Sequence, residues 1–222
     1  MRTSSAPVGN RGDRVKDALG RLHVLTDARG GRAALEAVTA AVRAGAPVVQ
    51  VRAKGCSDRE LYEFACQVVQ VCTPYGTTCI VNDRVDVAVA SGAAGTHLGA
   101  EDLPVAAARR VAGPDHILGG TARNPQRAAE LVVAGVDYLG VGPAYPTATK
   151  TGLPDPLGPA RVGAVAAAVA VPVVAIGGVT AERVPDLLAA GVHGIAVVAA
   201  VSGSADPAAA TRRLLDALGG AR

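Results

Sequence analysis

Short runs of β-branched and apolar residues alternate with alanine-rich segments of helical periodicity through almost all of this 222-residue sequence. Eight such strand-and-helix pairs follow one another from residue 22 onward, and the helical segments are typically followed by glycine. Strands that alternate with helices pair in parallel, because each helix returns the chain to the same edge of the sheet. We therefore predict an α/β fold, and specifically a single-domain (β/α)₈ TIM barrel.

The predicted elements can be placed by residue number. We expect strands at 22–27, 47–54, 78–83, 95–99, 116–120, 137–142, 172–178 and 193–198. We expect helices at 32–44, 57–72, 85–91, 104–111, 125–134, 159–170, 180–190 and 207–218. The alternative is an open doubly wound sheet, whose first turn usually carries the pattern GxGxxG. Residues 27–31 are DARGG, which does not match that pattern, so the barrel is favoured.

The composition suits a buried parallel sheet. The chain has no Trp, one Phe and four Tyr, while half of its residues are hydrophobic. The core must therefore be built mainly from Ala, Val and Leu, which fits strands that are covered on both faces by helices. The scarcity of aromatic rings also argues against a platform on which nucleic-acid bases stack. We expect residues 19–222 to form the barrel and residues 1–18 to form a flexible amino-terminal tail.

The charge pattern limits the classes of partner. The formal net charge is only +3, and the Lys and Arg residues are scattered. We therefore expect no nucleic-acid and no membrane partner, whereas small anionic substrates are compatible with the sequence.

The first residues lack the apolar stretch of a secretory signal, and no later run is long enough to span a bilayer, so we predict a cytoplasmic protein. The four cysteines lack metal-type pairing and are expected to be reduced. A homo-oligomer is compatible with the sequence, which does not determine the oligomeric state.

Polar residues gather where the predicted strands end, and in a barrel these ends share one mouth. Gln50, Arg52 and Lys54 alternate, so they share one face, and cations that face inward need an anionic partner. The alternative is that this face borders a helix and that the cations reach solvent. Asp83 and Asp102 follow neighbouring strands, as carboxylates that hold Mg²⁺ together with phosphate oxygens do. Each of them could instead cap the following helix.

Two glycine-containing stretches predict a second anion site. The loop GPAYPTATK, residues 142–150, brings together the hydroxyls of Thr147 and Thr149 and the ammonium group of Lys150. The pair at 177–178, with the backbone of Val198 and Ala199, lies where barrels bind phosphate through loop N–H groups. An ordinary surface loop and an ordinary turn are the simpler interpretations. Two anion sites at one mouth imply two phosphorylated substrates or one bisphosphate.

Five motifs in the same order resemble the thiamine phosphate synthase family. They are Gln50-Val-Arg52-Ala-Lys54, Val81-Asn82-Asp83, His97-Leu-Gly99 with Glu101-Asp102, the 142–150 loop, and Ile176-Gly-Gly178. The resemblance runs from Leu22 through nearly the whole chain. It implies an enzyme of thiamine biosynthesis that joins a hydroxymethylpyrimidine diphosphate to a thiazole phosphate, giving thiamine phosphate and diphosphate, with Mg²⁺.

The resemblance also assigns residues. The pyrimidine diphosphate would be held by Gln50, Arg52, Lys54, Asn82, Thr121 and Lys150, and the Mg²⁺ by Asp83 and Asp102. The thiazole phosphate would be held by Thr147, Thr149, Gly178, Val198 and Ala199. Arg52, Lys54 and Lys150 would be catalytic, because they stabilise the negative charge that builds on the departing diphosphate. No protein nucleophile is required.

The sequence departs from the family pattern at two positions. Ala100 stands where the family usually has Gln, and Ala199 where it usually has Ser. The first change removes a side chain near the pyrimidine end, and the second is tolerable if the contact uses backbone N–H. The alternative functions are a thiazole tautomerase, which generally lacks the Asn-Asp and Thr-x-Thr-Lys motifs, and a non-catalytic barrel that binds a phosphorylated ligand.

Overall fold

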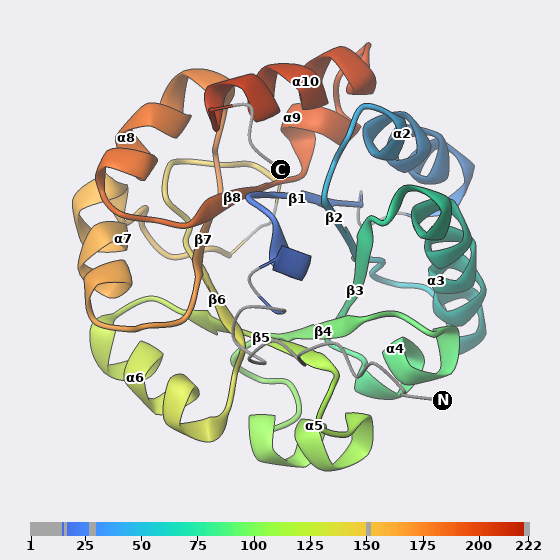
Figure 1. The fold of residues 1–222 in the computed structure, drawn as a ribbon, viewed down its shortest axis with the longest axis horizontal. Coiled ribbons are helices and arrows are strands. Elements are labelled where there is room, and N and C mark those ends of the chain that lie inside the picture. The colour runs from blue at the N-terminus through green and yellow to red at the C-terminus, as the bar shows by residue number, and fades with distance from the viewer. Residues whose placement is uncertain (1–14, 16, 27–29, 150–151, 220–222) are drawn as a thin grey trace, which may run out of the picture.

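The protein is a closed barrel of eight parallel strands surrounded by helices, as predicted (Figure 1). The structure, a computed structural model, describes residues 15, 17–26, 30–149 and 152–219. Each strand pairs with the next, and β1 closes the barrel against β8, with Leu22 opposite Ile195. This closure rules out the open doubly wound sheet.

The strands are short and their bounds are close to those predicted. They are β1 (Leu22–Leu25), β2 (Val48–Val51), β3 (Thr78–Asn82), β4 (Gly95–Leu98), β5 (Ile117–Ala122), β6 (Tyr138–Val141), β7 (Val173–Ile176) and β8 (Gly194–Val197). The helices are α2 (Gly31–Arg43), α3 (Asp58–Cys72), α4 (Val85–Ser91), α5 (Val105–Ala112), α6 (Pro125–Ala134), α7 (Gly158–Ala167), α8 (Val184–Ala189), α9 (Ala199–Ser202) and α10 (Pro207–Ala217). There are also two 3₁₀ turns, η1 (Thr73–Tyr75) and η2 (Ala181–Arg183).

Several predicted bounds differ from the structure, and three of these differences have a clear physical cause. The strand expected at 47–54 ends at Val51, because both backbone groups of Arg52 bond to the Thr26 hydroxyl instead of a neighbouring strand. The strand expected at 116–120 continues to Ala122, so Thr121 is a strand residue. The helix expected at 180–190 is split into η2 and α8, since Pro185 has no N–H and favours the first turn of a new helix.

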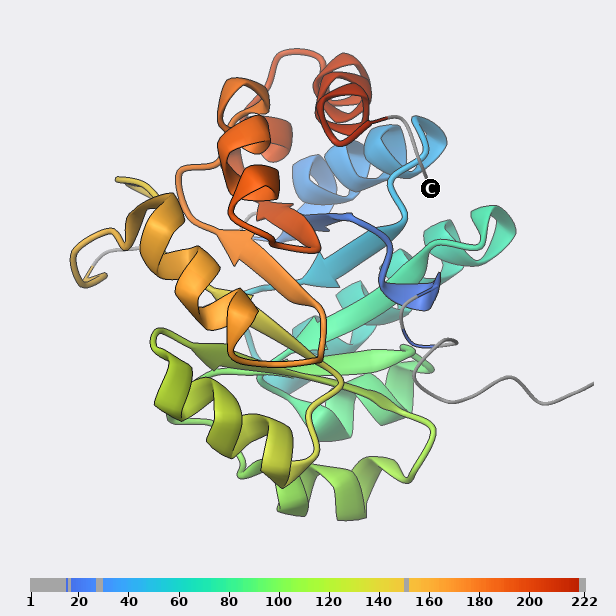
Figure 2. The same cartoon turned by 60° about the vertical axis from the view of Figure 1, so that its left-hand side comes forward.

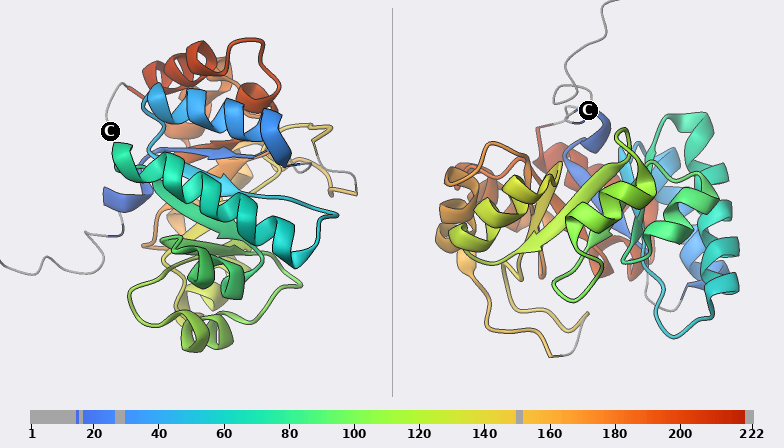
Figure 3. Two further views of the ribbon diagram at one scale, coloured as in Figure 1. Left: turned by 90° about the vertical axis from the view of Figure 1, so that its right-hand side faces the viewer. Right: turned by 90° about the horizontal axis from the view of Figure 1, so that it is seen from below.

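One end of the barrel is closed by apolar residues. Residues 15 and 17–19 are helical, and Val15 and Leu19 pack with Leu25, Val48 and other inward-facing side chains. The proposed flexible tail otherwise lies outside the described residues. The loop after β6 protrudes from the opposite end, as Figures 2 and 3 show. Access to the barrel interior is therefore from the carboxyl ends of the strands.

The closed end is also tied together by Arg109 of α5. Its guanidinium donates to the carbonyls of Gly113, His116 and Gly135, and it forms a 2.9 Å ion pair with Asp137. Asp137 in turn accepts a 2.8 Å hydrogen bond from the backbone N–H of Leu118. These contacts join the segments before β5 and β6, far from the open mouth.

The four cysteines are free, as expected. Among the described residues, none of the helices has the length and apolar character needed to cross a membrane.

Candidate active site

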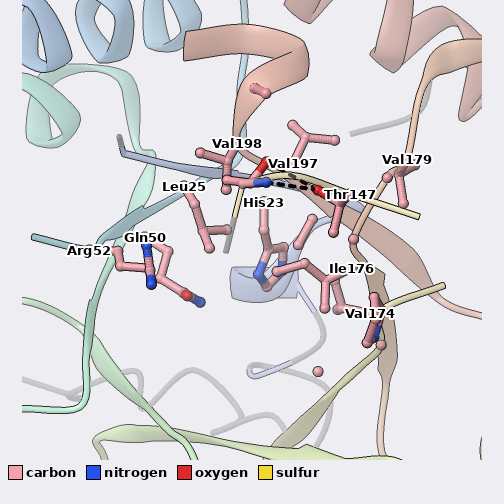
Figure 4. Close-up of a pocket in the computed structure, with 18 of the residues that line it drawn as sticks. His23, Leu25, Gln50, Arg52, Thr147, Val174, Ile176, Val179, Val197 and Val198 are labelled. Carbon is pink, nitrogen blue, oxygen red and sulfur yellow. Dashed lines mark hydrogen bonds between the residues drawn. The ribbon is translucent and has the colours of Figure 1, made fainter. Parts of the chain in front are cut away.

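A cavity of about 590 Å³ opens at the carboxyl ends of the strands. Every strand contributes to its lining, which runs from His23 on β1 to Ala196 on β8. Figure 4 shows His23 at the centre, with Gln50 and Arg52 on one side and Ile176 and Val179 on the other. This cavity has the size of a small-molecule site, and its place in the barrel is where such folds carry chemistry.

One side of the cavity carries the predicted cations. Gln50 projects inward from β2, and Arg52 and Lys54 follow in the loop, so all three line the cavity. This excludes the alternative that they face only solvent. The Lys54 ammonium donates to the Asp83 carboxylate, whereas Arg52 forms no ion pair with any described residue. A phosphorylated ligand would therefore meet a cation whose charge is available.

The two predicted metal carboxylates lie beside each other. Burial raises the pKa of Asp102, a 2.6 Å hydrogen bond from the Gly99 N–H partly offsets this, and the adjacent Asp83 carboxyl raises the pKa further. Asp83 has a φ of 65°, a conformation that is uncommon outside glycine and is often held at functional sites. Asp83 lines the cavity, whereas Asp102 is not part of the lining.

This pair fits a hard cation. The buried Asn82 Oδ1, next in sequence to Asp83, has no hydrogen-bond partner among the described residues. Within those residues no cluster of three or more His, Cys, Asp or Glu side chains occurs. The protein would thus supply only a few oxygen ligands, and Mg²⁺ commonly takes one or two carboxylates and completes its shell with phosphate oxygens and water.

The predicted residues of the second anion site also come together. Thr147, Thr149, Gly178, Val198 and Ala199 all line the cavity, and all of them except Gly178 line an adjoining pocket. The Thr147 and Thr149 hydroxyls lie 3.1 Å apart, and the Thr149 N–H donates to Thr147 Oγ1 at 3.3 Å. Lys150 lies outside the described residues, so its predicted role is not tested by the structure.

The loop that carries these threonines is docked on the glycine pair. The N–H groups of Ala144 and Tyr145 donate to the carbonyls of Ile176 and Gly177, at 2.8 and 3.0 Å. A Cβ atom at Gly178 would lie 2.4 Å from the Pro146 carbonyl oxygen. Only glycine allows the two loops to approach this closely.

Arg183 fixes the outer side of the same loop, and this residue was not identified from the sequence. Its guanidinium donates to the Gly178 carbonyl and stacks 4.6 Å from the centre of the Tyr145 ring. Arg183 also lines the cavity. It places a third cation near the mouth, on the side of the predicted thiazole phosphate.

The floor of the cavity is a set of buried aromatic and polar side chains that the sequence analysis did not assign. His23 Nε2 donates to the Leu19 carbonyl at 2.8 Å, and its buried Nδ1 has no partner among the described residues. Burial lowers the pKa of His23 to about 3 and that of His97 to about 4, so both rings are neutral. Tyr138, whose pKa is raised by burial, lies between them with its ring tilted against both, at centroid distances of 5.5 and 5.4 Å. The sequence does contain one indication of this role, since the period-two alternation of a strand turns His23 and Tyr138 toward the barrel interior.

The comparisons with known proteins agree with this arrangement. The model of the family described as thiamine monophosphate synthase matches residues 22–201. The chain belongs to this family. A thiamine-phosphate synthase of Salinispora tropica is 56% identical over 204 residues, covering 90% of this chain and 98% of the relative. One from Haloquadratum walsbyi is 45% identical over 190 residues, or 85% of each chain. A thiamine phosphate pyrophosphorylase structure from Pyrococcus furiosus superposes with a TM-score of 0.84 at 35% identity, covering 93% of this chain and 98% of that one. The predicted membership of the thiamine phosphate synthase family is thus confirmed.

The two departures from the family pattern have different surroundings. Ala199 lies in the cavity lining at the start of α9, where its backbone remains available to an anion. Ala100 is exposed in the loop between β4 and α5 and does not line the cavity. A side chain at position 100 would therefore have to reach inward from the rim to contact a ligand.

Proposed function

We propose that this chain joins 4-amino-2-methyl-5-(diphosphooxymethyl)pyrimidine to a thiazole ethyl phosphate, giving thiamine phosphate and diphosphate. The observation that carries the proposal is the shared cavity, which has Arg52, Lys54 and Asp83 on one side and Thr147 and Gly178 on the other. Two anionic substrates can therefore bind with their uncharged rings between these two sides. The family and the similarity to named thiamine-phosphate synthases support the same reaction.

The residues on the first side would hold the diphosphate. Arg52 and Lys54 would bind its oxygens, and Thr121 and Asn82 would contact the same substrate from the neighbouring strand ends. In this arrangement Lys54 exchanges Asp83 for a diphosphate oxygen, which costs little because the Lys54 side chain is 55% exposed. Cations placed where the leaving group gains charge stabilise the transition state without a covalent intermediate on the protein.

Asp83 and Asp102 would hold Mg²⁺ at the diphosphate. When bound there, the ion would neutralise charge on the leaving group. The Thr147 and Thr149 hydroxyls and the backbone at Gly178, Val198 and Ala199 would hold the thiazole phosphate. Lys150 keeps its predicted catalytic role on this loop.

The cavity walls would protect the reactive carbon from water. When the C–O bond to the diphosphate breaks, the pyrimidine methylene carries positive charge until the thiazole nitrogen forms the new C–N bond. Leu25, Val174 and Ile176 give this part of the cavity an aliphatic surface. Such a surface favours capture by the bound thiazole over capture by water.

The decisive experiment is an assay of both products. Purified protein given both substrates and Mg²⁺ should release diphosphate and form thiamine phosphate in equal amounts, and EDTA should abolish both. Arg52→Met should lower the rate strongly, whereas Arg32→Met, a change at a cation on the outer surface of α2, should not.

The other outcomes identify the alternative functions. Isomerisation of a thiazole phosphate without diphosphate release would indicate a tautomerase. Binding of either substrate without turnover would indicate a non-catalytic barrel. The cytoplasmic location, the lack of nucleic-acid and membrane partners, and homo-oligomer formation stay predictions of the sequence.

A further inference from the structure

Four side chains inside the barrel form one continuous hydrogen-bonded chain. The Gln50 amide nitrogen lies 3.3 Å from the Tyr138 hydroxyl, and that hydroxyl lies 3.0 Å from His97 Nδ1. His97 Nε2 lies 3.0 Å from the Thr121 hydroxyl. The chain thus runs from β2 through β6 and β4 to β5, and both of its ends line the cavity.

The direction of this chain depends on which ring nitrogen of His97 carries the proton. The neutral His97 ring has one N–H and one acceptor nitrogen, and the Tyr138 hydroxyl donates once. In the first direction the Gln50 amide N–H donates to Tyr138, Tyr138 to His97 Nδ1, and His97 Nε2 to Thr121. In the second direction His97 Nδ1 donates to Tyr138 and Thr121 donates to His97 Nε2, and the Tyr138 hydroxyl can then either accept from the Gln50 N–H or donate to the Gln50 oxygen. Only the first direction therefore fixes the Gln50 amide, with its N–H group toward Tyr138.

A bound diphosphate selects the first direction. Its oxygens only accept hydrogen bonds, so a contact with Thr121 requires the Thr121 hydroxyl to donate outward. Thr121 must then accept from His97, and by the same rule the Gln50 N–H group must bond to Tyr138. This leaves the Gln50 amide oxygen, which has no hydrogen bond from a described residue, as an acceptor at the cavity.

We propose that Tyr138 and His97 are positioning residues that link recognition of the diphosphate at Thr121 to recognition of an N–H donor on the heterocycle at Gln50. These hydrogen bonds require a single substrate to present a hydrogen-bond acceptor to Thr121 and a hydrogen-bond donor to Gln50. An aminopyrimidine diphosphate meets both conditions, whereas an oxo-pyrimidine that presents a carbonyl to Gln50 meets only the first. This inference rests on the proposed function, since it takes the pyrimidine diphosphate as the ligand.

Two glycines leave the space that the rings of Tyr138 and His97 occupy. A Cβ atom at Gly119 would lie 2.3 Å from Tyr138 Cζ and 2.6 Å from His97 Nδ1. A Cβ atom at Gly140 would lie 2.9 Å from His97 Cε1. The strands on either side of the two rings therefore lack side chains at the points where a methyl group would push the rings apart.

The test compares two non-reacting ligands. These are analogues of the aminopyrimidine diphosphate and of the matching oxo-pyrimidine diphosphate in which CH₂ replaces the ester oxygen, so that diphosphate cannot leave. Their dissociation constants are measured by calorimetry. The wild type should prefer the amino ligand. Tyr138→Phe frees the Gln50 amide to turn, so this preference should fall by about three- to tenfold, the value of one hydrogen bond. Tyr75→Phe, a change at an exposed tyrosine in η1, should keep the full preference.

A second measurement tests the transmission to Thr121. Tyr138→Phe should lower kcat, Thr121→Val should lower it more, and the double variant should be no worse than Thr121→Val alone. Thr121→Ser keeps the hydroxyl and should retain most activity. If Tyr138→Phe does not fold, as judged by circular dichroism, His97→Asn interrupts the chain at its next link and should give the same loss of preference.

The outcomes separate this inference from the proposed function. Two results would overturn the inference alone. One is an active Tyr138→Phe variant that keeps the wild-type preference for the amino ligand. The other is a double variant whose loss of kcat equals the product of the two single losses. Absence of diphosphate release by the wild type would overturn the proposed function, and the ligand preferences would still decide whether the chain of hydrogen bonds selects the heterocycle. Failure of both ligands to bind would overturn both.

Discussion

Replacing Gly178 with Ala should weaken binding of the thiazole phosphate by displacing a neighbouring loop. Gly178 has a φ of +64°, and a Cβ atom there would lie 2.4 Å from the Pro146 carbonyl oxygen and 2.9 Å from that of Tyr145. Real Cβ atoms essentially never approach closer than 3.0 Å, so the loop must retreat by at least about 0.6 Å. Thr147 follows Pro146 directly and would move with it.

The magnitude has a conformational and a steric part. Alanine in the left-handed region costs roughly 1–2 kcal/mol, which lowers the Tm of a domain of this size by about 2–8 °C. Gly191 offers a matched control, since its φ is +90° and a Cβ atom there would meet nothing within 4 Å. Gly191→Ala should therefore show the conformational part of the loss in stability without moving the loop.

Steady-state kinetics with each substrate varied in turn would measure the steric part. Because a misplacement of about 1 Å can cost roughly 100-fold, we expect Gly178→Ala to lower kcat/KM for the thiazole phosphate by about 10- to 100-fold, mainly through KM. The KM for the pyrimidine diphosphate should change by less than about threefold, since all of its predicted ligands except Lys150 lie on or after other strands. Gly191→Ala should leave both values near those of the wild type.

Two results would contradict this reasoning. If Gly178→Ala and Gly191→Ala had the same kinetics, contact between the two loops would not position Thr147. If Gly178→Ala raised KM equally for both substrates, the cavity would not contain two separate anion sites.

Three further predictions test the metal, the buried histidines and the closed end. Asp102→Asn should raise the Mg²⁺ concentration for half-maximal activity roughly tenfold or more without lowering Tm, as titration of activity with Mg²⁺ would show. Burial holds the pKa of His23 at about 3 and that of His97 at about 4, so below pH 6.5 the unfolded chain binds protons that the folded chain does not. The free energy of unfolding should therefore fall by about 2 kcal/mol for each ring between pH 7 and pH 5, and a urea midpoint that stays constant over this range would contradict it. Arg109→Met should lower the free energy of unfolding by about 3 kcal/mol, because its ion pair with Asp137 and its hydrogen bonds to three carbonyls would be lost, and a kcat that also fell would contradict a purely structural role.

Much of the barrel follows from local patterns. The alternation of strand and helix repeats eight times, and the helix bounds at 85–91 and 125–134 were predicted to the residue. The helix predicted to start at residue 57 is α3, whose N-cap is Ser57, and Ser57 and Glu60 form a capping box there. The strand ends were less predictable, because apolar alternation continues past the last ladder hydrogen bond. Residues 52–54 follow the pattern of β2, yet the Thr26 hydroxyl takes both backbone groups of Arg52.

The cavity floor shows where sequence patterns carry less information. Alternation turns Tyr138 inward, but it does not tell whether an inward tyrosine only fills the core or bonds to partners on distant strands. Its partners, Gln50 and His97, lie 88 and 41 residues away in the sequence. The missing side chains at Gly119 and Gly140 acquire their meaning only once the strands are paired, because each glycine faces a ring from another strand.

The role of the glycine pair at 177–178, at the cavity mouth, is likewise visible only in the folded structure. In the sequence the pair suggests only that a phosphate approaches the backbone closely. In the fold, Cβ atoms at Gly177 and Gly178 would lie 2.6 Å from the Pro143 side chain and 2.4 Å from the Pro146 carbonyl oxygen. The glycines therefore bring the Thr147 hydroxyl and the β7 loop to one place, so that a single ligand can contact both. The same two glycines determine both the contact between the loops and the geometry of the anion site. A substitution there therefore changes stability and substrate binding together. A control such as Gly191, which has a positive φ but no neighbouring loop, is needed to separate the two effects.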